Sequence, residues 1–205
     1  MKKIYQIILF CAIGFALVSC GGNGSNSASV KQNAEETDYK KACADGNFVR
    51  AHELVENMSD WDRHKSEAEN YVFNAEVKAV VIEYADENLL PRLQLMLSDY
   101  APTCEKPKAN RGIVNHSSAV EDLEDGCNEY EKQAKIYNSR CLKMIDILTI
   151  MGYQENAKKI ATCVLEIPHW SGDYNKRTDN YSWSIEYHDT QKQEALNKIA
   201  NARSL

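Results

Sequence analysis

The sequence predicts an all-α fold of antiparallel helical hairpins stacked as a short solenoid, with a possible small β-hairpin near residues 170–188. Three observations favour this fold. Apolar residues recur every three or four positions over most of the chain between residues 34 and 168. Gly46 and Gly152 interrupt this pattern, and glycine commonly ends a helix so that the chain can turn back. Later in the chain, apolar and polar residues alternate with the two-residue period of a strand.

Length and composition place the chain among globular proteins. It has 205 residues, of which 43% are hydrophobic and 26% are charged. A net charge of −6 argues against nucleic acid as the main partner, because nucleic-acid binding needs a cationic face. We divide the chain into four parts. Residues 1–19 are a signal peptide, and residues 20–33 are a flexible tether. Residues 34–168 are a helical-hairpin domain, and residues 169–205 are an aromatic-rich segment with a last helix that packs on that domain.

The first twenty residues have the form of a secretory signal peptide. Two lysines precede an apolar run, Ile4–Val18, that is too short to span a membrane. The run leads into Leu17-Val18-Ser19-Cys20, which resembles the lipobox of bacterial lipoproteins. The resemblance implies cleavage before Cys20, lipid on its sulfur and attachment to the membrane through that lipid. The alternative is an ordinary signal peptide cleaved near Ser19, with no role for Cys20.

The residues after Cys20 indicate where such a lipoprotein would lie. Residues 21–33 are rich in Gly, Ser and Asn, so we expect a flexible tether. In enteric-type lipoproteins, an Asp directly after the cysteine retains the protein at the inner membrane, and surface-exposed lipoproteins of some Gram-negative groups carry an acidic cluster there. This chain has neither. The resemblance therefore implies an outer-membrane lipoprotein of a Gram-negative-type cell, on the periplasmic face rather than the surface.

The helical pattern of the central region breaks at polar residues, glycines and prolines. The apolar stripe of residues 48–58 predicts one helix, and the strongly apolar residues 66–88 predict a longer one. Asn88 can cap the next helix, with Pro91 in its first turn, where a missing N–H is harmless. Residues 102–117 contain prolines, a glycine and several polar residues, so we expect a loop.

A further helical hairpin is expected on either side of Gly152. Ser118-x-x-Glu121 has the form of a capping box and predicts a helix from there to Gly152, with Gly126 as a point where it can bend. A returning helix over residues 157–165 is expected to stop at Pro168.

Beyond Pro168 the period of the sequence changes. Residues 181–188 alternate between large apolar and polar side chains, which predicts a strand with residues 170–174 as its antiparallel partner. An irregular aromatic loop is the alternative, because an isolated two-stranded hairpin is only marginally stable. Asp189 or Thr190 can then cap a last helix.

The two glycine breaks are followed by matching residues. An alanine lies five positions after each glycine and a large aliphatic residue three positions later, in the sets Gly46, Ala51, Leu54 and Gly152, Ala157, Ile160. This pattern resembles the turn and second helix of the tetratricopeptide repeat. The resemblance implies hairpins that stack as a solenoid and present a surface to another protein.

Five cysteines remain after the signal peptide and the lipidation site, and no Cys-x-x-Cys pattern links them. Its absence argues against a zinc ribbon or a thioredoxin-type redox site. Cys141 and Cys163 are equidistant from Gly152, so a hairpin turning there would bring them together as a possible disulfide. The alternative is two buried core thiols. Cys104 and Cys127 are the next plausible pair, which would leave Cys43 as a free thiol.

No motif in the sequence predicts catalysis. His52 and Glu53 begin a pattern like the zinc-protease HExxH, but Glu56 stands where the second zinc-binding histidine is required. The sequence contains no GxSxG, phosphate-binding glycine loop or dinucleotide fingerprint. The acidic residues between 121 and 125 lack the ligand spacing of a calcium loop. We therefore expect no enzyme activity and assign no catalytic residue, metal or cofactor.

The aromatic-rich segment is the candidate binding surface. Large aromatic side chains anchor protein interfaces and also stack on sugar rings. The other interpretation is that they cover the open end of the helical stack. We predict a lipid-anchored, non-catalytic interaction module whose partner is another envelope protein, and the alternative is a lipoprotein that binds an envelope glycan or ligand through this segment. The candidate surface consists of Trp170, Tyr174, Tyr181, Trp183 and Tyr187.

Overall fold

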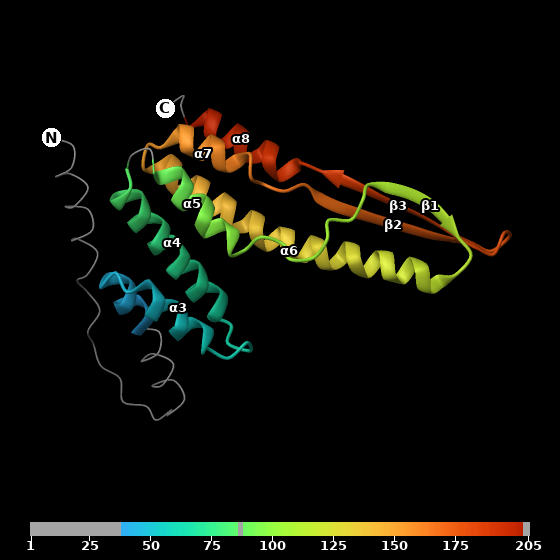
Figure 1. The fold of residues 1–205 in the computed structure, drawn as a ribbon, viewed down its shortest axis with the longest axis horizontal. Coiled ribbons are helices and arrows are strands. Elements are labelled where there is room, and N and C mark those ends of the chain that lie inside the picture. The colour runs from blue at the N-terminus through green and yellow to red at the C-terminus, as the bar shows by residue number, and fades with distance from the viewer. Residues whose placement is uncertain (1–37, 86–87, 203–205) are drawn as a thin grey trace, which may run out of the picture. The chain divides into compact units, whose positions relative to one another are not determined.

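The computed structural model describes residues 38–85 and 88–202. The predicted signal peptide, the predicted tether and Cys20 lie outside the described residues. Residues 38–44 are helical. The elements that follow are drawn in Figure 1 and are α3 (Phe48–Glu56), α4 (Lys65–Glu83), α5 (Leu89–Ser98), β1 (Asn110–Val114), α6 (Ser117–Ile150), α7 (Gln154–Ala161), β2 (Ile167–Asn175), β3 (Asn180–His188) and α8 (Thr190–Asn201).

The described chain is a mixed fold of helices and a sheet, so the all-α prediction is wrong. The three strands form one antiparallel sheet in the order β1-β3-β2. The β2–β3 hairpin is the one that the alternating pattern predicts. β1 lies inside residues 102–117, predicted as a loop, and pairs with β3 from Asn110 opposite Ile185 to Val114 opposite Tyr181. Because α6 packs on this sheet as well as on helices, the hairpins do not form a stacked solenoid.

The turn at Gly152 has the geometry that the sequence predicts. Its φ is +87°, in the left-handed region that favours glycine. The N–H of Gly152 donates to the carbonyl of Thr149, and the N–H of Tyr153 donates to the carbonyl of Leu148. These two bonds around a left-handed glycine are the Schellman motif, and here they end α6.

Gly46 ends the helix at residues 38–44 by the same pair of bonds, with φ at +74°. Five residues after each glycine, Ala51 and Ala157 are fully buried, so neither position has room for a larger side chain without overpacking. The chain therefore turns at Gly46 and at Gly152, as their positions in the sequence predict, although the helices on either side are not members of one regular stack.

α6 is a single helix of 34 residues that joins the sheet to the helical core. It begins at Ser117 with His116 as its N-cap residue, so the capping box predicted at Ser118 is wrong. Its second half lies at the centre of the main core, which α4, α5, α7 and α8 complete. Fully buried members of this core include Phe73, Leu93, Met144, Leu148 and Ile160.

A second, smaller core lies under α3. Ala51 and Val55 of α3 pack there against Ala68 and Val72 of α4. The next residue along α4, Phe73, belongs to the main core. α4 therefore lies between two cores and buries side chains on more than one side.

The returning helix α7 is shorter than predicted. It ends at Ala161, and the chain enters β2 at Ile167, so Pro168 lies within a strand rather than just beyond a helix. β2 is an edge strand, where a residue without an N–H is tolerated. Asp189 is the N-cap residue of α8, as predicted. Across residues 38–85 and 88–202, no helix combines the length and the apolar character that a membrane span needs.

Candidate functional site

The five aromatic residues of the candidate surface lie on one face of the sheet. Direct cross-strand partners share a face, and Tyr174 pairs with Tyr181. Trp170 lies four residues from Tyr174 on β2, and Trp183 and Tyr187 lie two and six residues after Tyr181 on β3, so even spacing places all five side chains on that face. We name this the aromatic face, and it lies against the first half of α6 (Figure 1). Tyr174 is 41% exposed and the other four are partly buried.

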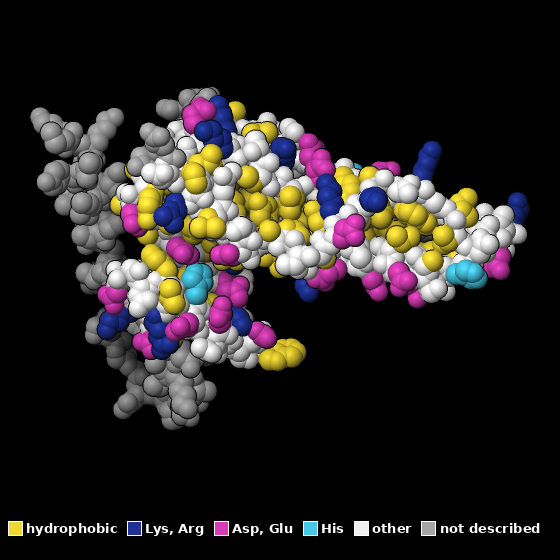
Figure 2. Space-filling model, viewed as in Figure 1, with side chains coloured by type: hydrophobic (Ala, Val, Ile, Leu, Met, Phe, Trp, Pro, Cys, Tyr) yellow, Lys and Arg dark blue, Asp and Glu magenta, His cyan; other side chains and the backbone are white. Residues whose placement is uncertain are grey.

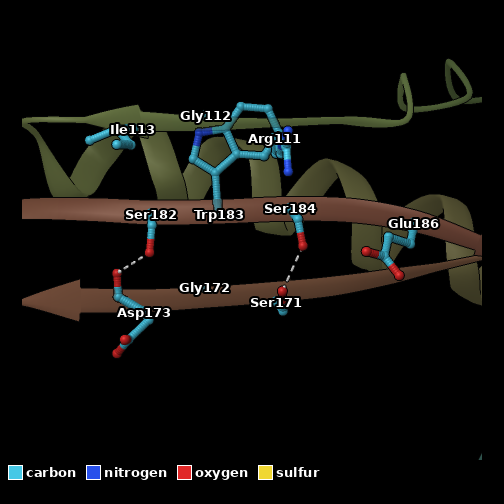
Figure 3. A pocket seen from close by; sticks show the side chains of 10 residues that line it. All are labelled: Arg111, Gly112, Ile113, Ser171, Gly172, Asp173, Ser182, Trp183, Ser184 and Glu186. Carbon is cyan, nitrogen blue, oxygen red and sulfur yellow. Dashed lines mark hydrogen bonds between the residues drawn. The ribbon is translucent and has the colours of Figure 1, made fainter.

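Trp170 and Trp183 lie close together on the aromatic face with nearly parallel rings. Their ring centroids are 6.0 Å apart and their planes differ by 12°. The Trp183 indole reaches across to Gly112 of β1 (Figure 3), where a Cβ would stand 3.0 Å from three indole atoms. A Cβ at Gly172 would lie 3.4 Å or more from Trp170. The glycines therefore let both indoles approach the backbone of the sheet.

The tyrosines of the aromatic face fix the sheet to neighbouring segments. The Tyr187 hydroxyl donates a hydrogen bond to the carbonyl of Pro107, in the loop before β1. Burial raises the pKa of Tyr187 to about 12, so this hydroxyl keeps its proton at neutral pH. The Lys106 ammonium lies 4.3 Å from the centroid of the Tyr187 ring. At the far end of the hairpin, the Tyr174 hydroxyl donates to the Asp179 carboxylate at 2.7 Å.

Two grooves lie between α6 and the aromatic face, one on each side of the helix. The first has a volume of about 530 Å³, contains Trp183 and Ile185, and is bounded by residues 105–110 and by α6 at Asp122, Leu123 and Gly126. We name it the Trp183 groove. The second has a volume of about 440 Å³, contains Trp170, Tyr174 and Tyr181, and is bounded by α6 at Ser117, Val120, Glu121 and Glu124. We name it the Trp170 groove. Figure 2 shows hydrophobic side chains gathered on the surface where α6 and the strands meet.

The opposite face of the sheet carries polar side chains together with Ile113, which is 70% exposed. A hollow of about 540 Å³ has a lining that includes Arg111, Asp173, Glu186, three serines and Trp183 (Figure 3). The hydroxyls of Ser171 and Ser184 hydrogen-bond to each other across the strands at 2.8 Å. No described residue of α6 lines this hollow, whereas α6 forms one wall of each of the two grooves.

Cys141 and Cys163 are neighbours, and both are free thiols. Burial raises the pKa of Cys141 to about 12, and the nearby Cys163 adds to the rise. The hydroxyl of Tyr137 forms a hydrogen bond with Cys141, beside the same pair. Their nearness agrees with a hairpin that turns at Gly152. The disulfide is not formed in the structure, and it stays a prediction.

His52 and Arg140, in the helical part, are each held by other side chains of the protein. The Nε2 atom of His52 lies 3.0 Å from the carboxylate of Glu76 on α4, and this hydrogen bond raises the pKa of His52. The Arg140 guanidinium lies 5.0 Å from the ring centroids of both Phe73 and Tyr100. Within the described part of the chain, no group of three or more His, Cys, Asp or Glu side chains is arranged to hold a metal ion.

Several residues that build the Trp183 groove were not predicted as site residues. Lys106 and Lys108 fall in the predicted loop, and Asp122 falls in the acidic run of α6. β1 has only five residues with a glycine at its centre, so its pattern resembles a loop. Gly126 is the residue whose position in the sequence indicates this groove. A glycine inside a helical pattern is unfavourable, so its presence there indicates a packing or functional reason.

No family model, curated protein or solved structure matches the chain. The lipoprotein resemblance therefore stays a prediction from the sequence. The grooves beside α6, the exposed side chains and the N-terminal sequence are the observations from which a function can be inferred.

Proposed function

We propose that the chain is a lipid-anchored envelope protein that acts as a non-catalytic protein-interaction module. The lipobox-like residues Leu17–Cys20 and the Gly-, Ser- and Asn-rich residues 21–33 support attachment through a flexible tether. Trp61 supports the interaction role and carries the proposal, since its side chain is 96% exposed. Tryptophan is enriched among the residues that dominate binding at protein interfaces.

Trp61 lies in the turn between α3 and α4, and hydrogen bonds hold the backbone of this turn. The N–H of Asp62 donates to the carbonyl of Ser59 at 2.8 Å, and the N–H of Lys65 donates to the carbonyl of Asp62 at 3.0 Å. The Lys65 ammonium donates to the Asp60 carboxylate at 2.5 Å, which lowers the pKa of Asp60. The turn is ordered while its largest side chain stays in water.

This arrangement specifies the chemistry of a partner. An ordered turn loses little backbone freedom on binding, so more of the energy of burying the indole contributes to affinity. Asp60 and Asp62 flank Trp61, but Lys65 pairs with Asp60 and Arg63 follows Asp62, so the turn carries two charges of each sign. The partner is therefore expected to offer an apolar pocket for the indole.

Trp61→Ala is expected to abolish capture of the partner protein while changing the free energy of unfolding by no more than about 0.5 kcal/mol, because the side chain contributes almost nothing to packing. Cross-linking of the tagged full chain in intact envelopes, followed by purification, measures capture. Ile82→Ala is the control, since it removes another exposed apolar side chain, on α4, and should keep the partner. Equal recovery of one partner by wild type and Trp61→Ala would contradict the role of Trp61.

Cys20→Ser tests the anchor. The serine hydroxyl cannot replace the thiol that forms the lipid-bearing thioether, so the variant is expected either to leave the membrane or to stay unprocessed. Membrane fractionation and the intact mass of the chain measure these outcomes. A Cys20→Ser chain that is cleaved and still sediments with membranes would show that the attachment is not through lipid on Cys20.

A second candidate function is binding of an envelope glycan or related ligand, and the grooves beside α6 favour it. Ligand sites are concave and largely apolar, with a few polar groups that fix orientation. Four residues of the candidate surface line the two grooves, with Trp183 in one and Trp170, Tyr174 and Tyr181 in the other. Their rings can stack on the apolar face of a sugar.

A further inference from the structure

We propose that the Trp183 groove is a binding site for a neutral saccharide, which stacks on the Trp183 indole in the space that Gly126 leaves open. The inference deepens the second proposed function and rests on it.

The sheet side of the groove offers a flat apolar surface. Trp183 and Ile185 are alternate residues of β3, and the indole lies against the backbone of β1 at Gly112. Leu123 of α6 and Pro107 of the preceding loop add further apolar walls. An indole with backbone behind it cannot rotate freely, so it presents a fixed ring to the C–H face of a sugar.

The rim of the groove carries both signs of charge in equal number. Lys106 and Lys108 stand with Glu105 and Asp122, and Asn110 adds an amide. The Lys106 ammonium also donates to the Glu166 carboxylate at 3.3 Å, so Lys108 is the lysine with its ammonium left for a ligand. A neutral polyol donates hydrogen bonds to the carboxylates and accepts them from the Lys108 ammonium. A charged ligand would be attracted by one half of this rim and repelled by the other half. The charge balance therefore selects a neutral, hydroxyl-rich ligand.

The Trp170 groove has a different rim. Glu121, Glu124 and Asp173 line it, and no Lys or Arg of the described residues does. The hydroxyls of Ser117 and Tyr181 can donate to a sugar, but three carboxylates without a basic residue in the lining favour a cationic ligand over a neutral one. The neutral saccharide is for this reason assigned to the Trp183 groove, where the charges of the lining balance.

Gly126 accounts for the open space beside Trp183. It lies inside α6, where glycine is about 1 kcal/mol less favourable than alanine. A Cβ at Gly126 would meet nothing within 4 Å, and its φ is not in the left-handed region. Neither a close contact nor the backbone conformation requires a glycine there. Its missing side chain does keep the groove wide, which is what a stacked ligand requires.

The test measures binding of two neutral probes, cellotriose and tri-N-acetylchitotriose, to the full chain by calorimetry in a detergent without a sugar headgroup. The wild-type chain is expected to bind at least one probe with an affinity that changes little with salt, because the rim has no net charge. Gly126→Leu is expected to weaken that binding about tenfold or more, since the leucine occupies the groove. Gly126→Ala should weaken it by no more than about threefold.

Folding and binding are separated by the choice of variants. Leucine and alanine are better helix formers than glycine, so both Gly126 variants should keep or raise the unfolding midpoint. Asn128→Leu is the matched control, because it adds a leucine at an exposed position of the same helix that lines neither groove. It should leave probe binding unchanged.

Three other binding results would each contradict a different part of the proposal. If neither probe binds the wild-type chain and an anionic oligogalacturonate does not bind either, saccharide binding fails, and this site fails with it. If a probe binds wild type and Gly126→Leu equally well, saccharide binding stands and the assignment to the Trp183 groove is wrong. If the oligogalacturonate binds in place of the neutral probes, the ligand class is wrong.

Discussion

Asn138→Ala is expected to lower the free energy of unfolding by about 2–4 kcal/mol. Asn138 is fully buried on α6. Its amide nitrogen donates to the Leu165 carbonyl at 2.8 Å and to the Gln191 side-chain oxygen at 2.7 Å, and its oxygen accepts from the Leu165 N–H at 2.8 Å. Alanine would leave three polar groups without these partners, and each such group costs about 1–3 kcal/mol when it is fully buried.

The bonds of Asn138 hold three segments together. Leu165 lies in the connection between α7 and β2, and Gln191 lies in the first turn of α8. Asn138 stands on the part of α6 between the main core and the aromatic face. Its loss is therefore expected to loosen the start of the β2–β3 hairpin and α8 together, in one transition.

Urea unfolding followed by circular dichroism measures this effect. Asn57→Ala is the control, because Asn57 is exposed and its side chain donates to the Glu53 carbonyl of the same helix, so its loss should stay within about 0.5 kcal/mol. Asn138→Asp should destabilise at least as much as alanine at neutral pH, since its carboxylate cannot donate to the Leu165 carbonyl. A loss below about 1 kcal/mol for Asn138→Ala would mean that water replaces these bonds.

Local signals in the sequence predict the turns and the β2–β3 hairpin correctly. Gly46 and Gly152 act through their own φ and through bonds to residues a few positions away, so a short stretch of sequence contains the whole cause. The alternation of residues 181–188 is likewise a property of neighbouring residues, and it places the aromatic side chains on one face of the sheet.

β1 is missed because its cause is distant in the sequence. Residues 110–114 become a strand by pairing with β3, which follows only after the whole of α6 and α7. Once β1 and the hairpin form a sheet, the first half of α6 has a sheet to cover. This sheet excludes an all-α solenoid. The glycines at the turns still predict each turn correctly, because a turn depends only on residues near it in the sequence.

Burial of polar residues is also decided by tertiary packing. Asn138 and Arg140 lie on a helix rich in charged residues, and nothing in their spacing separates them from its exposed positions. Ile82 is an apolar residue with the opposite outcome. It belongs to the strongly apolar helix predicted over residues 66–88, but it is 66% exposed. For the candidate site, the aromatic residues could be predicted from sequence, and the groove walls at residues 105–110 and Gly126 could not.

Gly112→Val is expected to lower the free energy of unfolding by about 1–3 kcal/mol and to displace Trp183. A Cβ at this position would stand 3.0 Å from three atoms of the indole, closer than van der Waals contact allows. Trp170 lies beside the indole with a nearly parallel ring, so the displaced indole is expected to move into the Trp183 groove, where water reaches it. Valine otherwise favours strands, so a loss of stability would come from the clash.

Fluorescence in a Trp61→Phe background reports the displacement, because that change removes the most exposed of the three tryptophans. Gly172→Ala is the matched control, since its Cβ would lie 3.4 Å or more from Trp170 and requires little movement. A red shift and lower stability for Gly112→Val, with neither for Gly172→Ala, would show that Trp183 is held against β1. An unchanged spectrum and unchanged stability for Gly112→Val would mean that the indole does not lie there, and the apolar floor of the Trp183 groove would have to be abandoned.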